Sequence, residues 1–252
     1  MRVTVLGCAT STGVPIAGCN CTVCESPEPK NKRTRSSILV NLDDKNLLID
    51  SSTDLRLQAL STGLTRIDAV LYTHTHADHT HGIDDLRTFN FINKMSIPCF
   101  GSSQTIENLQ DNFKYIFDES YSAGGKPKLE LNVIDGEFSI YDIRVIPVDV
   151  EHAEWTITGY RIGDMAYLTD CSGIPEHSKE SLKDLDVLII GVLRYEPHPA
   201  HLSVDEALEV IEEIKPKRAF FTHMGHELDY FELSGRLPSG VEPAYDGMQI
   251  DI

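Results

Sequence analysis

The chain has 252 residues, of which 41% are hydrophobic and 24% are charged, and its formal net charge is −17. This composition is typical of a globular protein, while the acidity argues against a nucleic-acid partner, because phosphate-backbone binding relies on clustered Lys and Arg. No apolar run approaches the roughly 20 residues of a membrane helix, and the first residues lack the features of a signal peptide. We therefore expect a cytoplasmic protein with no membrane partner.

Strands dominate the first part of the chain. Short apolar runs predict them at residues 3–7, 36–42, 46–50 and 68–73. The loop between the first two strands contains two prolines and a local basic run, which is typical of a solvated surface loop. Two helices are expected next, over residues 104–117 and over residues 82–93, where four apolar side chains fall roughly on one side: Ile83, Leu86, Phe89 and Phe91.

Strands return between residues 129 and 223, and one helix interrupts them. Ser203 and Glu206 have the spacing of a capping box and predict that this helix spans residues 203–216. Two runs of strands that carry helices without strict alternation favour an α/β fold of the α+β type, a four-layer αββα sandwich with its sheets face to face. No stretch has the composition of a linker, so we expect a single domain over residues 1–252.

Four histidines and an aspartate crowd into one stretch that follows a predicted strand. In an extended segment His74 and His76 point to the same side and can bind one cation. Asp78 and His79 lie past the bend and can bind a second cation beside it. Imidazole and carboxylate ligands suit zinc, manganese or iron. The last histidine, His81, has no clear partner, and we expect it to start a helix or to support a ligand.

Further ligands are offered where later apolar runs end. His152, Asp170 and His223 each follow such a run, which predicts that they meet the histidine cluster at the rim of the sheets. An aspartate in this place can bridge two cations. One cation then takes His74, His76, His152 and Asp170, and the other takes Asp78, His79, Asp170 and His223. Asp50 either orients a ligand histidine from behind or is a turn residue at a strand end.

The chain has six cysteines, and three of them form a Cys-x-Cys-x-x-Cys motif: Cys19, Cys21 and Cys24. Three thiolates leave a tetrahedral zinc one ligand short, and His226, three residues after His223, is a suitable fourth ligand. A closed site of this kind in the loop 19–24 is structural and not catalytic. Unpaired or disulfide-linked cysteines are the alternative interpretation.

These segments resemble the metallo-β-lactamase superfamily, and within it the PhnP-like branch, over essentially the whole chain. The matching segments are GCNCTVC, HTHADH, LTDCSGIP, THMGHELD and LPSGVEPAYDGMQI. The resemblance implies a metallo-β-lactamase fold, two catalytic divalent metals (Mn²⁺ or Zn²⁺), one structural Zn²⁺ and a homodimer. It also implies a hydrolase of phosphoric diesters with a small phosphorylated substrate. The substrate of that branch is 5-phosphoribosyl 1,2-cyclic phosphate, which is opened to ribose 1,5-bisphosphate.

In that branch a histidine near the start of the late helix contacts the phosphate and aids proton transfer, and it matches His201 here. The resemblance thus makes His201 and Asp170 the expected catalytic residues. His201 can instead be a residue of the helix start with no catalytic part, and His198 is a weaker candidate for the same task. The segment that leads to His201, GVLRYEPHPAHLS, departs from the pattern of the branch where it faces the substrate.

Three alternatives share parts of this pattern. A tRNA 3′-processing nuclease of the same superfamily has the histidine motif, but it needs basic RNA-binding elements that a chain with a net charge of −17 lacks. A non-hydrolytic metalloprotein like PqqB shares the cysteine motif, but its metal-site pattern is altered, whereas every ligand of the pair is present here. A hydrolase of another ester can use the same metal pair, because the ligand set does not name the bond that is cleaved.

Overall fold

The computed structural model describes residues 1–118, 120 and 125–252, and within them the strands form two sheets of seven strands each. The first sheet has the spatial order β14 (Gln249–Asp251), β1 (Arg2–Gly7), β2 (Ser37–Leu42), β3 (Lys45–Ile49), β4 (Ala69–Leu71), β5 (Ile97–Gly101) and β6 (Leu129–Val133). The second has the order β13 (Val241–Pro243), β12 (Arg218–Thr222), β11 (Val187–Gly191), β10 (Met165–Leu168), β9 (Trp155–Ile162), β8 (Ile143–His152) and β7 (Phe138–Ile140). Both sheets are mixed, with parallel and antiparallel neighbours.

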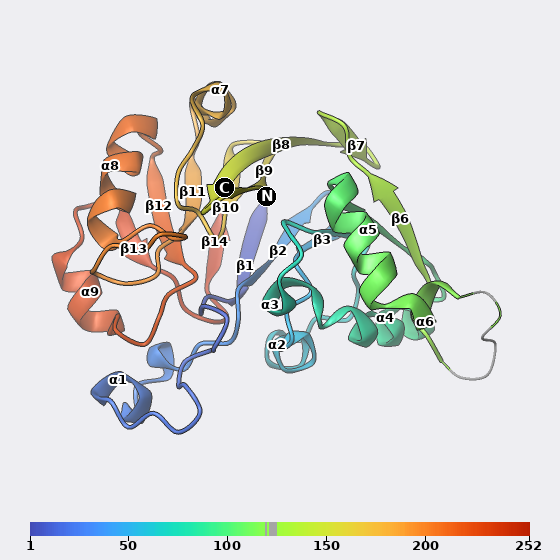
Figure 1. Ribbon diagram of the computed structural model, residues 1–252, viewed down its shortest axis with the longest axis horizontal. Coiled ribbons are helices and arrows are strands. Elements are labelled where there is room, and N and C mark those ends of the chain that lie inside the picture. Colours follow the sequence, from blue (N-terminus) through green and yellow to red (C-terminus); the bar gives the residue numbers. More distant parts are fainter. Residues whose placement is uncertain (119, 121–124) are drawn as a thin grey trace.

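Helices cover the outer face of each sheet (Figure 1). The first sheet carries α2 (Leu55–Thr62), α3 (Ala77–Thr80), α4 (Leu86–Asn93), α5 (Ser103–Asn112) and α6 (Lys114–Phe117). The second sheet carries α7 (Glu176–Lys179), α8 (Val204–Ile214) and α9 (Tyr230–Arg236), while α1 (Thr22–Glu25) lies in the N-terminal loop. The predicted four-layer αββα sandwich is confirmed.

The alternation of side chains along the strands explains the layers. In β2, Ile38 and Val40 are buried in the core between the two sheets, whereas Leu39 between them is buried in a second core under the helices. In β3, Leu47 and Ile49 point to the first core and Leu48 to the second. Successive residues of a strand face opposite sides, so a sheet with apolar residues at every position must be covered on both faces.

The helix predicted at residues 82–93 begins as a single 3₁₀ turn at Ile83–Asp85 and continues as α4. Ile83, Leu86 and Phe89 are buried as expected, but the placement of Phe91 was wrong, since its side chain is 85% exposed. Residues two apart on an α-helix point about 200° away from each other, so Phe91 lies opposite Phe89. The helix expected over residues 104–117 is divided into α5 and α6 by the non-helical Phe113.

The basic run of the loop 24–37 is not wholly solvated, contrary to the sequence expectation. Arg33 is only 2% exposed, and its Nη2 donates to the carbonyl oxygens of Gly225 and Leu228 at 3.0 and 2.9 Å. A buried guanidinium is tolerated only where backbone or charged acceptors surround it. The acceptors come from the far end of the chain, so no local pattern could reveal them.

The capping box predicted for the late helix is present at the start of α8. Ser203 Oγ accepts a hydrogen bond from the backbone N–H of Glu206, and the Glu206 carboxylate accepts from the backbone N–H of Ser203. This cap fixes the point at which the chain leaves the loop that contains His201. None of the helices in the described part of the chain combines the length and the apolar character that a bilayer crossing requires.

Candidate metal centre

The predicted ligands of the two catalytic cations lie just past strand ends, where the two sheets share one edge. They are His74 and His76 after β4, Asp78 and His79 in α3, His152 at the end of β8, Asp170 after β10 and His223 after β12. The first sheet thus contributes the histidine motif, and the second sheet contributes one ligand from each of three strands. The carboxyl ends of parallel strands meet at one edge of a sheet, which brings the later ligands together.

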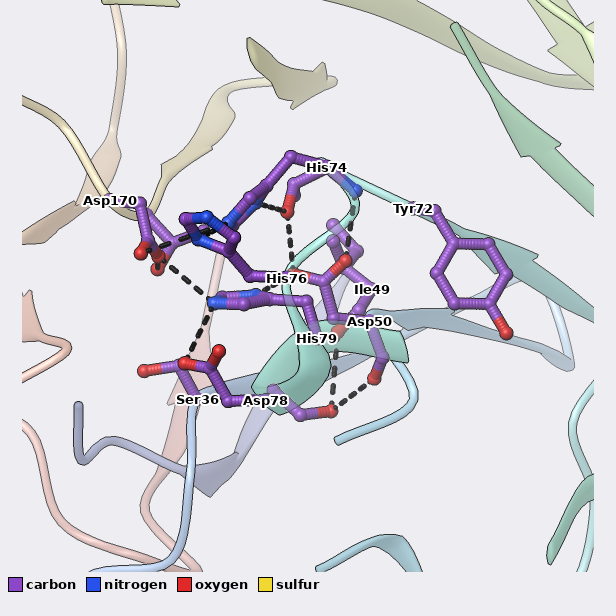
Figure 2. A network of polar contacts seen from close by, with 12 residues as sticks. Ser36, Ile49, Asp50, Tyr72, His74, His76, Asp78, His79 and Asp170 are labelled. Atoms are coloured by element: carbon purple, nitrogen blue, oxygen red, sulfur yellow. Dashed lines mark hydrogen bonds and ion pairs between the residues drawn. The ribbon is translucent and has the colours of Figure 1, made fainter. Parts of the chain in front are cut away.

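The ligand atoms converge in two groups, and within each group they all lie within 4.8 Å of one another: His74, His76, His152 and Asp170 in the first, Asp78, His79, Asp170 and His223 in the second. Asp170 belongs to both. Its Oδ1 lies 3.1 Å from His79 Nε2 and 3.1 Å from His223 Nδ1, while its Oδ2 lies 3.9 Å from His74 Nε2. Figure 2 shows the His79 ring pointing toward Asp78 and Asp170. A carboxylate in this position can bridge two cations.

The donor set fits divalent cations. Asp78 Oδ2, His79 Nε2 and His223 Nδ1 are buried without a hydrogen-bond partner, and all three belong to the second group. Burial alone would lower the pKa of His79, but the surrounding carboxylates outweigh it and raise that pKa well above its usual value. Burial lowers the pKa of His74, whose imidazole is therefore neutral and free to coordinate. A cation satisfies the buried lone pairs and offsets the carboxylate charge together.

Asp50 supports ligands of both groups from behind, as Figure 2 shows. One carboxylate oxygen, Oδ2, accepts from His79 Nδ1 at 2.7 Å and from Thr73 Oγ1 at 2.8 Å, and Oδ1 accepts from the Thr73 backbone N–H. Because the Thr73 hydroxyl donates to Asp50, it accepts from His74 Nδ1 at 3.0 Å. Both imidazoles therefore donate from Nδ1 and turn Nε2 toward the centre, where a cation would replace the second proton of His79.

Two other ligand histidines are fixed in the same way. His152 Nδ1 donates to the carbonyl oxygen of Ala200 at 2.9 Å, which turns Nε2 toward the centre. In His223 the two ring nitrogens exchange these roles. Its Nε2 lies 3.1 Å from Thr10 Oγ1, and its Nδ1 faces Asp170 in the centre. Sequence reasoning missed Thr10, Thr73 and Ala200. Only Thr73 had a local signal, since it directly precedes the histidine motif.

Three residues of the site have the left-handed backbone conformation that non-glycine residues rarely adopt. The φ angles are 64° at Asp50, 51° at Asp170 and 57° at His223. Each follows the end of a strand, so the chain turns sharply at the residue whose side chain enters the centre. Backbone strain of this kind clusters at functional sites, where the surrounding structure holds it in place. Asp50 therefore both turns the chain and supports the ligands, the two roles that the sequence left open.

His201 lies beside the centre, with its ring centroid 4.9 Å from those of both His152 and His223. Its Nδ1 is buried without a partner, and burial lowers its pKa to about 3. The His198 ring centroid lies 5.2 Å from that of His201, and His198 Nδ1 accepts from the Ala200 backbone N–H, so His198 holds the loop and belongs to neither ligand group. His81 is exposed at the end of α3, packs against a phenylalanine ring and belongs to neither ligand group.

The cysteine motif forms a third group with His226, with all ligand atoms within 4.8 Å. The sulfur atoms of Cys19, Cys21 and Cys24 lie 3.4, 3.5 and 3.6 Å from His226 Nδ1. A tetrahedron with zinc–ligand bonds of about 2.0–2.3 Å has edges of about 3.5 Å, which matches these separations. All six cysteines are free, so the disulfide alternative does not apply. The group joins the N-terminal loop to the loop after β12, three residues from His223.

The chain is similar in sequence and fold to known proteins. The family described as beta-lactamase superfamily domain matches residues 45–224. The crystal structure of a new diphosphatase from the PhnP family superposes with a TM-score of 0.93 at 40% identity and covers 100% of this chain and 97% of that one. Zn²⁺-bound PqqB from Methylobacterium extorquens has a TM-score of 0.82 at 22% identity, with 100% of both chains covered, and this likeness shows the fold alone.

Octanoyltransferase of Porphyromonas gingivalis is 37% identical over 257 residues, which are 99% of this chain and 51% of that protein. The chain therefore spans about half the length of this curated relative. Coenzyme PQQ synthesis protein B of Methylobacterium radiotolerans is 38% identical over 101 residues, 34% of each chain. The family match covers most of the chain, and the PhnP-family structure covers all of it. The chain belongs to the beta-lactamase superfamily, with the metallo-β-lactamase fold, and to its PhnP-like branch.

Proposed function

We propose that this protein is a hydrolase that uses two divalent metals, Mn²⁺ or Zn²⁺, and opens cyclic phosphodiesters such as 5-phosphoribosyl 1,2-cyclic phosphate. The observation that carries the proposal is the pair of ligand groups that share Asp170. The His201 ring lies beside one histidine of each group, His152 and His223. The PhnP-family structure at 40% identity supports phosphoryl chemistry, since it is described as a diphosphatase. When bound, the two cations supply Lewis-acid chemistry: they acidify water near neutral pH and offset charge on phosphoryl oxygens.

The chain's own residues hold and orient the reactants. Asp170 would bind both cations, and Asp50 keeps His74 and His79 in the tautomer that coordinates. In this proposal His201 contacts the phosphoryl group and protonates the departing sugar oxygen. Burial lowers the pKa of the His201 imidazole to about 3, so the side chain must gain its proton in the complex with substrate before it can give it up.

A hydrolysis screen with the manganese-loaded protein tests the proposal. The substrates are 5-phosphoribosyl 1,2-cyclic phosphate, bis(p-nitrophenyl) phosphate, p-nitrophenyl phosphate and p-nitrophenyl octanoate. We expect turnover of the diesters, little turnover of the monoester and none of the octanoate. Turnover of the octanoate alone would contradict the proposal and would point to the chemistry of the octanoyltransferase relative.

The role of His201 is tested by two diesters with different leaving groups. Nitrophenolate leaves readily without a proton, whereas the sugar alkoxide of a cyclic ribose phosphate needs one. His201→Ala should therefore lower kcat/KM mildly for the nitrophenyl diester and by about 10²-fold or more for the cyclic phosphate. Equal losses on both substrates would leave His201 as a phosphate contact only.

A diphosphate is the second candidate substrate, because the structure at 40% identity is described as a diphosphatase. In a diphosphate diester the leaving group is itself a phosphate, which needs less proton assistance than an alkoxide. A diphosphate diester added to the same screen separates the candidates. Faster turnover of the diphosphate, with little effect of His201→Ala, would favour it over the cyclic phosphate.

A further inference from the structure

An exposed indole ring lies against the candidate metal centre. Trp155 is the only tryptophan of the chain, and its side chain is 48% exposed. Its ring centroid lies 5.2 Å from that of His76 and 6.5 Å from that of His152, two ligands of the first group. Aromatic rings contribute most to stability when they are fully buried, so a half-exposed indole in this place adds little to the core.

The backbone fixes the position of the ring. Trp155 is the first residue of β9 and faces His152, the last residue of β8, across a two-residue hairpin turn. Facing residues of an antiparallel pair project from the same side of the sheet, so the indole and the ligand imidazole emerge together. The backbone N–H of Thr158 donates to the carbonyl oxygen of Thr73, which joins β9 to the histidine motif. In Figure 1, β8 and β9 lie between α8 on one side and α5 on the other.

The ring and His201 both lie near the ligand histidine His152. The His152 ring is 6.5 Å from the indole and 4.9 Å from His201. A substrate with its phosphoryl group at the centre would therefore lie close to both side chains. Under the proposed function His201 takes the departing oxygen, which leaves the indole for another part of the same substrate molecule.

We propose that Trp155 is a stacking platform for a planar heteroaromatic group of the substrate, so that the substrate class is a nucleotide-type phosphoester. The assignment rests on the proposed function. An indole offers a flat apolar face to any nucleobase, and stacking of a base on an aromatic side chain needs no particular sequence. Polar groups for the edge of a base are close by, because Trp155 shares a small cleft with Thr75 and Gln104. The cleft has a volume of about 10 Å³, the size of one water, so the base would lie on the open ring face.

The single tryptophan provides a binding measurement that does not depend on turnover. AMP and ribose 5-phosphate share a phosphorylated ribose and differ in the base. We expect AMP to quench the fluorescence of the zinc-loaded protein and to bind on the order of 10-fold more tightly than ribose 5-phosphate in calorimetry. In Trp155→Leu the preference for AMP should vanish, whereas Trp155→Phe, which keeps an aromatic face, should retain most of it.

Turnover provides a second measurement. Bis(p-nitrophenyl) phosphate and methyl p-nitrophenyl phosphate have the same leaving group, but only the first retains an aryl group. Trp155→Leu should reduce the kcat/KM ratio of the two substrates about 10-fold, mainly through KM of the aryl diester. Phe91→Leu is the matched control, since it removes an aromatic ring that is 85% exposed on α4, and it should leave the ratio unchanged.

The outcomes separate this inference from the proposed function. Equal binding of AMP and ribose 5-phosphate by the wild type, or a preference that survives in Trp155→Leu, would overturn the platform. A preference for AMP that depends on Trp155, together with no hydrolysis of any phosphodiester, would support the platform and overturn the proposed function. Circular dichroism of Trp155→Leu verifies the fold, which we expect to persist because the ring is half-exposed at a hairpin end.

Discussion

At the scale of single residues, Asp170 has the most contacts to lose, because its two oxygens face ligands of both groups. Asp170→Asn keeps the shape of the side chain but removes the charge that a bridging ligand needs. We expect hydrolysis to fall by at least about 10²-fold, with the bound catalytic metal reduced, while the fold persists. Metal analysis and circular dichroism check both parts. Asp149→Asn, at a surface aspartate paired with His177, is the control and should change neither.

Asp50 belongs to neither ligand group but accepts hydrogen bonds from His79 and Thr73. Its substitution therefore tests how much the orientation of the ligand histidines contributes to metal binding. Asp50→Asn should lower metal affinity or activity about 10–100-fold, because His79 loses its carboxylate acceptor and Thr73, which accepts from His74, loses the carboxylate to which it donates. Thr73→Val breaks only the relay to His74, so its effect should be smaller. Metal titrations monitored by calorimetry measure both variants. An Asp50→Asn protein with the metal affinity of the wild type would show that backbone geometry alone orients the ligands.

At the scale of structural elements, the N-terminal loop with α1 depends on the cysteine group. Zinc binding to such a group is also folding free energy, because the site does not exist in the unfolded chain. Cys21→Ala should lower the zinc content and the melting temperature, and activity should fall only indirectly, through the loop that holds His223. Cys99→Ala, at a buried cysteine outside every ligand group, should keep the zinc content of the wild type. Unchanged zinc content and melting temperature in Cys21→Ala would rule out a structural zinc.

At the scale of the whole molecule, the candidate metal centre joins the two sheets, since its predicted ligands come from both. Metal removal should therefore destabilise the fold as well as stop hydrolysis. At a free metal concentration 100 times Kd, binding adds about 2.7 kcal/mol to the free energy of unfolding, or roughly 5–10 °C in Tm for a chain of this size. Scanning calorimetry before and after a chelator measures the shift. In Asp170→Asn the shift should be much smaller, and an equal shift would assign it to the cysteine group.

Much of this protein was determined by local sequence. Alternating apolar residues specify the strands and their two covered faces, and the capping box at Ser203 specifies the start of α8. The spacing of the histidine motif and of the cysteines predicts three ligand groups, because each motif places two or three suitable donors within reach of one cation. Phe91 shows where apolar character misleads. It was expected on the buried side of its helix because it is apolar, but the 100° turn per residue places it opposite the buried Phe89.

Only the tertiary structure decided which distant groups support the centre. Ala200 and Thr10 orient ligand histidines through contacts that span 48 and 213 residues, and Arg33 is buried by carbonyl groups 192 and 195 residues away. The hairpin register that sets Trp155 beside His152 is likewise a property of the folded sheet. A carbonyl oxygen or a hydroxyl has no sequence signature, because every residue carries a carbonyl and hydroxyls are common. The sequence by itself therefore determined which residues form the candidate ligand groups, and the packing of the two sheets determined their orientation and their surroundings.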